Sequence, residues 1–249
     1  MIALRSQREI AKLRAANLMV AQVLQLVKKS VAPGVTTAAL DKIAEDEILK
    51  QGARPAFKGY AGFPATLCTS INHEIVHGIP SKKRKLKEGD IISIDVGVCL
   101  DGYYGDAALT VPVGIVGKAS QHLLKVTEES LHIAIANAVV GEKLYTVSHS
   151  VQKHAEANGF SVVRDFVGHG IGTELHEPPQ IPNYGKPGTG LTLKAGMVIA
   201  IEPMVNMGSY GVRVLDDGWT AVTIDHFRSA HFEHTIAITD DGPKILSQI

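Results

Sequence analysis

The chain has 249 residues, of which 45% are hydrophobic and 20% are charged, and its 25 basic and 25 acidic residues leave no formal net charge. A chain of this length buries about 70–75% of its unfolded surface and needs no disulfide to hold a core, while the balanced charge argues against bulk nucleic-acid binding. The two cysteines are consistent with a reducing compartment. The sequence shows neither a secretory signal nor an apolar run of ~20 residues, so we predict a cytoplasmic protein that does not cross a membrane.

Apolar residues at helical spacing predict four helices, arranged as two pairs. The first helix begins at the capping box formed by Ser6 and Glu9 and ends before Pro33, and glycines stop the other three. These three cover residues 37–51, 118–140 and 145–158.

Segments typical of strands follow each helix pair. Residues 91–98 and 103–111 flank Leu100–Asp101–Gly102 and indicate a β-hairpin, whereas residues 53–65 are rich in glycine, proline and aromatics and indicate a loop. Further strands are predicted at residues 161–164, 197–202, 211–215, 219–224 and 231–238. The order helix, helix, strands therefore occurs twice, which favours an α+β fold.

An internal repeat accompanies this order. The segments Lys87–Asp95 and Lys194–Glu202 read KEGDIISID and KAGMVIAIE, at an offset of 107 residues. The same offset relates Gly34 to Gly141 and Gly52 to Gly159. These matches predict a single domain of two similar halves, about residues 1–112 and 113–249, with the functional site at their boundary, which we call the seam.

Four acidic residues interrupt apolar, strand-like segments: Asp95, Asp106, Glu202 and Glu233. A buried carboxylate without a partner is costly, so any one of the four, taken alone, is better explained as facing solvent. In the predicted hairpin, however, Asp95 and Asp106 fall on one face, where they repel unless a cation lies between them. The repeat predicts a matching pair of Glu202 and Glu233, which indicates a cage for a divalent metal ion. His169, set among glycines, would shift the preference towards transition metals.

Several short motifs also occur in order along the chain. They are His77–Pro80, Asp95, Asp106, Gly168–Gly172, His176–Pro178, Ile201–Pro203 and Glu233–Thr235. In these motifs, and over essentially its whole length, the sequence resembles the type I methionine aminopeptidases of the bacterial form, which lack a zinc-binding extension and the helical insertion of type II. The resemblance implies the pita-bread fold of creatinases and aminopeptidases, an α+β fold with two pseudo-symmetric halves, antiparallel sheet and helices packed outside.

The resemblance also implies two divalent ions, of cobalt, manganese, iron(II) or zinc. The expected ligands are Asp95, Asp106 and Glu233 for one ion, and Asp106, His169, Glu202 and Glu233 for the other. The implied reaction removes the N-terminal methionine from nascent proteins and peptides, preferentially before a small second residue. Metal-activated water or hydroxide attacks the first peptide bond.

Three residues are expected to take part in that reaction. Glu202 would move a proton to the leaving amine, His176 would contact the developing gem-diolate oxygen, and His77 the backbone at the scissile bond. The resemblance places Phe57, Tyr60, Phe63, Cys68, Leu175 and Trp219 in an apolar methionine pocket. Four residues depart from the commoner bacterial pattern: Phe57 replaces cysteine, Phe63 tyrosine, Leu175 phenylalanine and His231 glutamine.

Other interpretations remain open at this stage. His73–His77 matches the HExxH motif of zinc proteases, although Ile75 and Val76 favour a strand over the helix that this chemistry needs. A proline-specific dipeptidase or aminopeptidase shares the fold and the five ligands, but usually has a further N-terminal domain. A non-catalytic relative that binds partners would lose ligands, and Cys68 as a nucleophile lacks a base to activate it.

A run of five basic residues lies in Lys82–Lys87. Such a run is usually a solvated surface, but contact with ribosomal RNA through phosphates is a further hypothesis, since methionine is removed from nascent chains. The family expectation for the oligomeric state is a monomer.

Overall fold

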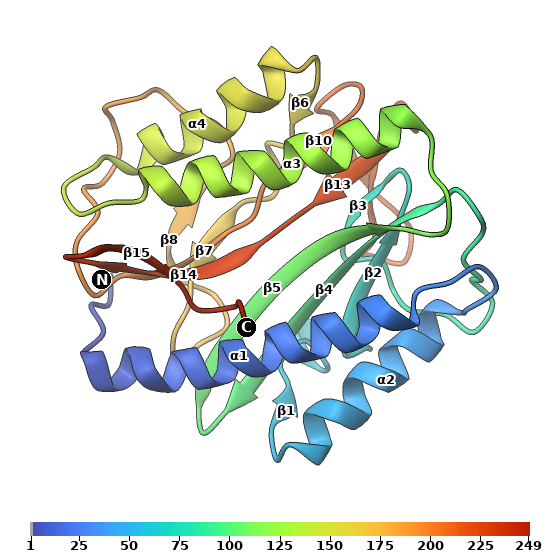
Figure 1. Ribbon diagram of the computed structural model, residues 1–249, viewed down its shortest axis with the longest axis horizontal. Coiled ribbons are helices and arrows are strands. Elements are labelled where there is room, and N and C mark those ends of the chain that lie inside the picture. The colour runs from blue at the N-terminus through green and yellow to red at the C-terminus, as the bar shows by residue number, and fades with distance from the viewer. Residues whose placement is uncertain (1) are drawn as a thin grey trace.

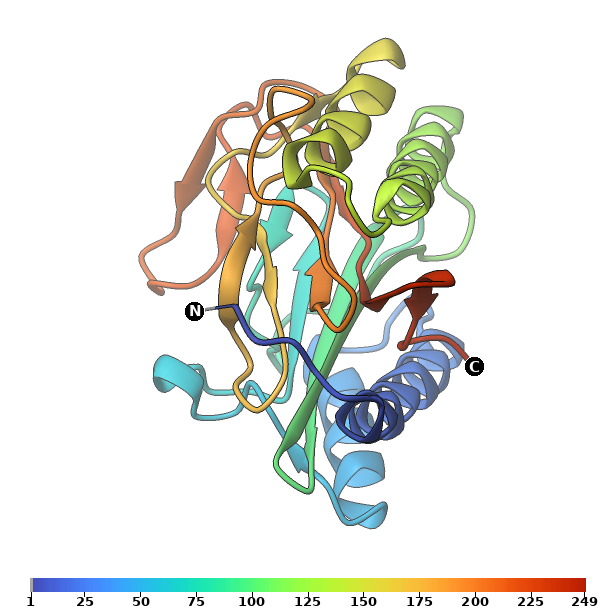
Figure 2. The ribbon, with the colours of Figure 1, turned by 90° about the vertical axis from the view of Figure 1, so that its left-hand side faces the viewer.

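The computed structural model describes residues 2–249, and within them two helix pairs lie on one side of the strands (Figures 1 and 2). The helices are α1 (Gln7–Ser30), α2 (Thr37–Lys50), α3 (Lys118–Asn137) and α4 (Leu144–Ala157). Ser6 accepts a hydrogen bond from the backbone of Glu9 and the Glu9 carboxylate accepts one from the backbone of Ser6, so the predicted capping box starts α1.

Strands of the first half form an antiparallel sheet around the predicted hairpin. The sheet contains β1 (Arg54–Pro55), β2 (Leu67–Ile71), β4 (Ile91–Leu100) and β5 (Tyr103–Pro112). The main sheet of the second half has the order β15-β14-β9-β7-β8. Its strands are β7 (Gly168–Gly170), β8 (Glu177–Ile181), β9 (Val198–Ile201), β14 (His234–Thr239) and β15 (Gly242–Ile245).

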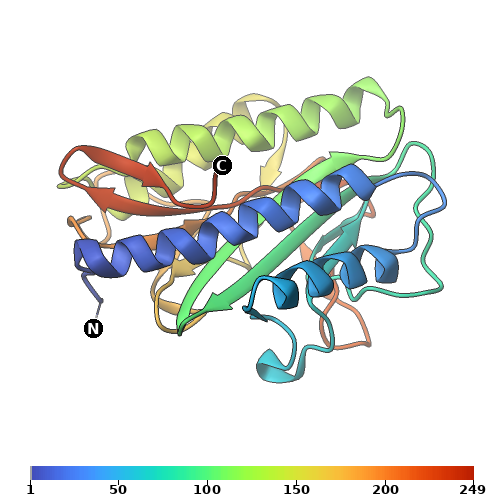
Figure 3. The same cartoon turned by 60° about the horizontal axis from the view of Figure 1, so that its bottom comes forward.

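Two smaller antiparallel sheets complete the described part of the chain. One joins β6 (Ser161–Val162), β10 (Met204–Asn206) and β13 (Ser229–His231), and the other joins β3 (Glu74–Val76), β11 (Val212–Val214) and β12 (Ala221–Thr223). Strands β14 and β15 lie between α1 and α3, where the two halves meet (Figure 3).

The repeat is visible in equivalent hydrogen bonds before α2 and α4. Gly34 N donates to Leu86 O over 2.8 Å, and Gly141 N donates to Leu193 O over 2.9 Å. Both glycines have a left-handed backbone, with φ of 88° and 90°, which a residue with a side chain rarely adopts. Isolated β-bridges at the same offset join Thr36 to Lys85 and Lys143 to Thr192.

Each half has a buried apolar core, and a third cluster spans the seam. Side chains of α1, α2 and the first sheet form one core, and those of α3, α4 and the second sheet form another. The third cluster combines Leu13 and Phe63 from the first half with Leu175, Val198 and Ala237 from the second. Burial across the seam therefore holds the two halves together.

The first residues of the chain cross to the second half. Arg5 N donates to Gly196 O over 2.7 Å, and the Arg5 guanidinium pairs with Glu177 at 2.5 Å. Among the described helices, α1 alone has the length and hydropathy of a membrane span. Ten of its side chains are buried, and it packs against α2, β4 and β5, so α1 is a helix of the core.

The prediction of a single strand at residues 231–238 is wrong. The segment divides into β13 and β14, because the backbone of Phe232 and Glu233 turns away to bond Pro203 and β5 instead of either neighbouring ladder. The predicted loop at 53–65 contains β1 and a short 3₁₀-helix at Tyr60–Gly62. The sequence predicts no strand at β7 or β8, since GHG has no β-branched residue and EPPQI has one, Ile181, after two prolines that strands disfavour.

Candidate metal centre

Two carboxylates of the centre come from the β4–β5 hairpin. Asp101 and Gly102 form its two-residue turn, both with positive φ, and this fixes the register. Asp95 pairs with Ala108 and Asp106 pairs with Gly97, so the two carboxylates lie diagonally on one face, as predicted.

The other two carboxylates come from the second half, where the β9–β14 ladder ends. His234 pairs with Ile201 as the last pair, so Glu202 follows β9 directly and Glu233 directly precedes β14. Glu233 N donates to Ala108 O over 2.9 Å, which attaches this end of the second sheet to the hairpin of the first. All four acidic residues therefore lie at the seam.

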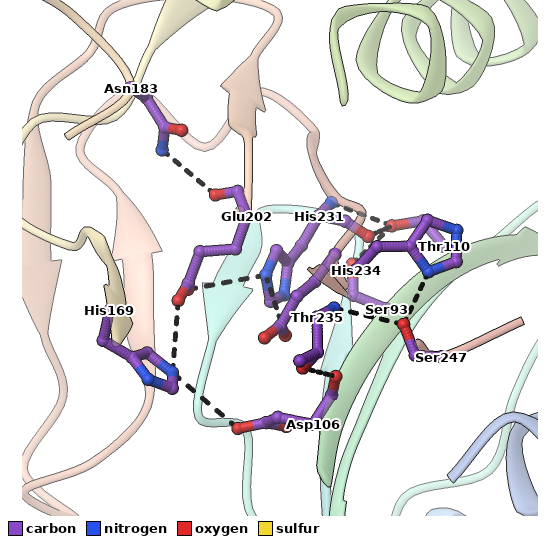
Figure 4. Close-up of polar contacts among 11 residues, drawn as sticks. Ser93, Asp106, Thr110, His169, Asn183, Glu202, His231, His234, Thr235 and Ser247 are labelled. Carbon is purple, nitrogen blue, oxygen red and sulfur yellow. Dashed lines mark hydrogen bonds and ion pairs between the residues drawn. The ribbon is translucent and has the colours of Figure 1, made fainter. Parts of the chain in front are cut away.

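His169 lies on β7 between two glycines that its position requires. A Cβ at Gly168 would lie 2.3 Å from Ala200 O, and one at Gly170 would lie 2.3 Å from Pro178 O. His169 Nδ1 contacts Gly170 O at 2.9 Å, which directs Nε2 towards the carboxylates. His169 Nε2 lies 3.8 Å from Asp106 Oδ2 and 3.6 Å from Glu202 Oε1 (Figure 4).

The carboxylates are buried together without enough hydrogen-bond donors. Asp95 Oδ1, Asp106 Oδ1 and Glu233 Oε1 are buried and have no partner. Burial raises the pKa of Asp95 to about 7, and burial with repulsion from neighbouring carboxylates raises the pKa values of Asp106, Glu202 and Glu233 well above their usual range. Burial lowers the pKa of His169 to about 3. Among the described residues these acids pair with His169 and His231, and burial lowers the pKa of each imidazole to about 3, so neither offsets the acids with a positive charge.

A divalent cation fits this donor set. One atom each of Asp106, His169 and Glu233 lies within 4.8 Å of the other two. Four carboxylates and one imidazole are the oxygen and nitrogen donors that first-row divalent metals bind. A cation there would satisfy the unpartnered oxygens and favour their ionised form.

One cavity of about 620 Å³ contains every predicted site residue. Its lining includes the five proposed ligands, His77, His176 and the six residues predicted for the methionine pocket. The Phe63 and Trp219 rings meet edge to face with centroids 5.1 Å apart, and Leu175 is buried in the same wall. The cavity thus has a carboxylate-rich end and an apolar, aromatic end.

His77 and His176 lie against this cavity in different settings. His176 Nδ1 shares a hydrogen bond of 2.7 Å with the Tyr60 hydroxyl, and its ring centroid lies 4.3 Å from that of His169. His77 has a left-handed backbone with φ of 62°, a strained conformation for a side chain of this size, and packs edge to face on Phe166. Burial lowers the pKa of His77 to about 4 and also lowers the pKa of His176.

Two residues that orient Asp106 were not predicted. Asn17 Oδ1 accepts from Asp106 N over 3.2 Å, and Thr235 Oγ1 donates to Asp106 O over 2.7 Å. Asn17 is fully buried on α1, four residues after Leu13. A polar residue on the apolar stripe of a helix was the signal that could have identified it.

Two rival chemistries do not fit the structure. His73–His77 is not helical: Glu74 lies on β3, accepts from Ile71 N over 2.8 Å and pairs with Arg84 at 2.7 Å, so it holds a turn and is no zinc-protease base. Burial and the carboxylates near Cys68 raise the pKa of its thiol well above the usual value, the opposite of an activated nucleophile.

Comparison with known proteins agrees with the geometry. The family model of metallopeptidase family M24 matches residues 11–240. The chain is 53% identical to a methionine aminopeptidase of Clostridium perfringens over 249 residues, which is 100% of both chains. The crystal structure of a methionine aminopeptidase from Thermotoga maritima has 48% identity and a TM-score of 0.99, with 100% of both chains covered.

A more distant structure shows how far the fold extends. The prolidase from Pyrococcus horikoshii has 22% identity and a TM-score of 0.80, and the match covers 98% of this chain and 63% of the prolidase. These similarities confirm the predicted pita-bread fold with its two pseudo-symmetric halves. The chain therefore belongs to metallopeptidase family M24.

Proposed function

We propose that this chain is a methionine aminopeptidase that removes the initiator methionine from nascent proteins and peptides, preferentially before a small second residue. The observation that carries the proposal is one cavity lined both by the five proposed metal ligands and by apolar and aromatic side chains. The full-length similarity to methionine aminopeptidases supports the same conclusion.

Two divalent ions are proposed for the carboxylate-rich end. Asp95, Asp106 and Glu233 would hold one, and Asp106, His169, Glu202 and Glu233 the other, with Asp106 and Glu233 shared. Cobalt, manganese, iron(II) and zinc all suit these donors. When bound, the ions supply Lewis acidity at the scissile carbonyl and make water more acidic.

The chain's own residues bind the substrate and move protons. Glu202 lies in the cavity beside His169, where its carboxylate would accept a proton and return it to the leaving amine. Tyr60 engages Nδ1 of His176 and leaves Nε2 to donate to the carbonyl oxygen as its negative charge develops. His77, whose ring packs against Phe166 in the same cavity, would bond the substrate backbone.

The apolar end suits a methionine side chain. Leu175, Phe63 and Cys68 are each at most 5% exposed, and such a wall excludes water from a thioether. The departure at Phe57 is accommodated by the hairpin: a Cβ at Gly97 would lie 2.5 Å from the Phe57 ring, so the ring occupies the space that glycine leaves. The pocket therefore remains apolar despite the departures from the common pattern.

A peptide panel tests this function. Metal-free enzyme supplied with manganese or cobalt should release free methionine from Met-Ala-Ser, and release should fall steeply when a bulky residue replaces the alanine. Without added metal, release should be lost. Turnover of an X-Pro peptide in place of Met-Ala-Ser would instead support the prolidase alternative.

We further propose that the enzyme is cytoplasmic and monomeric and contacts the ribosome through Lys82–Lys87. Four lysines of this segment are exposed, whereas Arg84 is engaged by Glu74. Charge reversal of Lys82, Lys83 and Lys85 leaves that ion pair intact and should reduce co-sedimentation with ribosomes. Unchanged co-sedimentation would contradict the ribosome contact.

A further inference from the structure

His231 lies directly behind the proposed metal centre and has no role in the mechanism above. It is the last residue of β13, its side chain is 1% exposed, and it does not line the cavity. Its Nε2 atom is buried without a hydrogen-bond partner. A buried polar atom of this kind is expensive unless it serves a neighbouring group.

The backbone of His231 is held from the first half of the molecule. His231 N donates to Thr110 Oγ1 over 2.9 Å, and Thr110 Oγ1 donates to His231 O over 2.8 Å. Ser93 Oγ lies 2.8 Å from the same hydroxyl, which completes a chain of hydrogen bonds from β4 through β5 (Figure 4). Since His231 also pairs with Met204 in its own sheet, its backbone is held from two sides.

The imidazole faces two of the proposed metal ligands. His231 Nε2 lies 3.7 Å from Glu202 Oε2 and 4.0 Å from Glu233 Oε2. The other oxygens have different surroundings: Glu202 Oε1 faces His169, and Glu233 Oε1 is buried without a partner. Each carboxylate therefore presents one oxygen to His231 and keeps the second for the centre.

We propose that His231 is a positioning residue whose imidazole N–H directs the Oε2 atoms of Glu202 and Glu233 away from the centre, so that their Oε1 atoms are available to metal. Carboxylate ligands are commonly oriented by a hydrogen-bond donor behind them. Glutamine, the usual residue here in the family that the sequence resembles, also carries an N–H donor, so donation is the property the two side chains share. The inference rests on the proposed metal centre.

Metal binding to the complete chain tests this role without relying on activity. Isothermal titration of metal-free protein with Mn²⁺ gives affinity and stoichiometry, and the visible spectrum of the Co²⁺ form reports ligand geometry. The variants are His231→Gln, which keeps a donor, and His231→Leu and His231→Met, which remove it. Methionine fills irregular core space, so it provides a second donor-free variant if leucine disturbs folding. His149→Leu on α4 is the matched control, since His149 Nδ1 is also buried without a partner but lies outside the cavity.

The donor-free variants should bind Mn²⁺ about 10–100-fold more weakly with unchanged stoichiometry and a shifted Co²⁺ spectrum. His231→Gln and His149→Leu should remain within about threefold of the parent. Parent-like affinity in folded His231→Leu or His231→Met, or equal losses in His231→Gln, would overturn the positioning role. A loss of one whole ion from the stoichiometry of the donor-free variants would also overturn it, since that result would indicate that His231 is itself a metal ligand. Failure of the parent protein to bind divalent ions would overturn the proposed function instead.

Discussion

Asp106 is one of the two residues shared by both proposed metal positions. Its carboxylate is buried with one unpartnered oxygen, while its backbone is held by Asn17 on one side and Thr235 on the other. The side chain therefore cannot turn towards solvent to relieve repulsion from Glu233. Its charge can be removed in place by a proton, which the raised pKa favours, or balanced in place by a bound cation.

Asp106→Asn keeps the shape of this side chain and removes its charge. Because Asp106 is shared by both proposed ion positions, we expect metal content to fall and methionine release to drop by about 100-fold or more. Elemental analysis of dialysed protein and a peptide assay measure the two effects. Asp240→Asn, at an exposed turn, is the control. Full metal content together with full turnover in Asp106→Asn would contradict the cage.

The Tyr60–His176 hydrogen bond gives a second prediction at this scale. Tyr60→Phe should lower kcat about fivefold, since one hydrogen bond contributes ~1 kcal/mol, and His176→Phe should lower it by about 10²–10⁴-fold. If Tyr60 acts by orienting His176, Tyr60→Phe should have no further effect on kcat in the His176→Phe background. Additive losses in the double variant would show that the hydroxyl acts independently.

At the scale of elements, the centre depends on how closely α1 approaches β5. A Cβ at Gly105 would lie 2.8 Å from the backbone of Ala16 and Asn17, and Asn17 is the residue that bonds Asp106 N. The glycine is thus required by the contact between helix and strand, and this contact positions a proposed ligand.

Gly105→Ala should therefore destabilise the fold and weaken metal binding together. Forcing extra volume into a packed contact costs about 1–3 kcal/mol, and displacement of Asn17 would move Asp106. Urea unfolding and Mn²⁺ titration measure the two effects. Gly117→Ala, where a Cβ meets nothing within 4 Å, should leave Mn²⁺ affinity unchanged and lose only the small preference for glycine at the N-cap of α3. A destabilised Gly105→Ala protein with parent-like Mn²⁺ affinity would separate the helix contact from the centre.

Elements with strong local patterns were predictable from the sequence. The capping box and the apolar stripe specify α1, and the Asp101–Gly102 turn between alternating strands specifies the hairpin. The hairpin register then places Asp95 and Asp106 on one face, so two of the four carboxylates of the proposed cage could be brought together from the sequence of these two strands alone.

The remaining elements depend on contacts between distant segments. Strand β7 forms because β8 and β9 pair with the backbone of its GHG segment, and no pattern within that segment predicts the pairing. Residues 231–238 alternate like one strand, yet β13 and β14 belong to different sheets. The positions of His169 and Glu233, and the ring of His231 behind them, therefore needed the folded structure.

At the scale of the whole molecule, the proposed ions would join the two halves. Asp95 and Asp106 come from the first half, and His169, Glu202 and Glu233 from the second. A ligand that binds only the folded state stabilises it by about 2.7 kcal/mol when its concentration is 100 times Kd. For a chain of this size, that free energy raises the melting temperature by about 5–10 °C. Metal removal should reverse this shift in a calorimeter.

Titration of Asp95 should make the metal-free protein less stable as pH rises. Burial places the pKa of folded Asp95 at about 7, above the value of 3.8 for an exposed aspartate. Between these values the native state binds more protons than the unfolded state, so the free energy of unfolding falls with increasing pH. Buried histidines act in the opposite sense, because burial lowers the pKa of His77 to about 4 and that of His169 to about 3, so the unfolded state binds their protons. Parent and Asp95→Asn share these histidines, so in a chelator the melting temperature of the parent should fall relative to that of Asp95→Asn from about pH 5 to about pH 8. Saturating Mn²⁺ should remove this relative fall, and parallel profiles without metal would contradict the prediction.

The linker between β5 and α3 joins the half that carries Asp95 and Asp106 to the half that carries the other three proposed ligands. Ile115 in this linker is 84% exposed, while the apolar clusters on either side belong largely to separate halves. A peptide-bond cut there would yield two fragments, neither of which retains more than three of the five donors. Divalent cations would then behave as a reversible cross-link, and fragment association would strengthen with the free concentration of the ion.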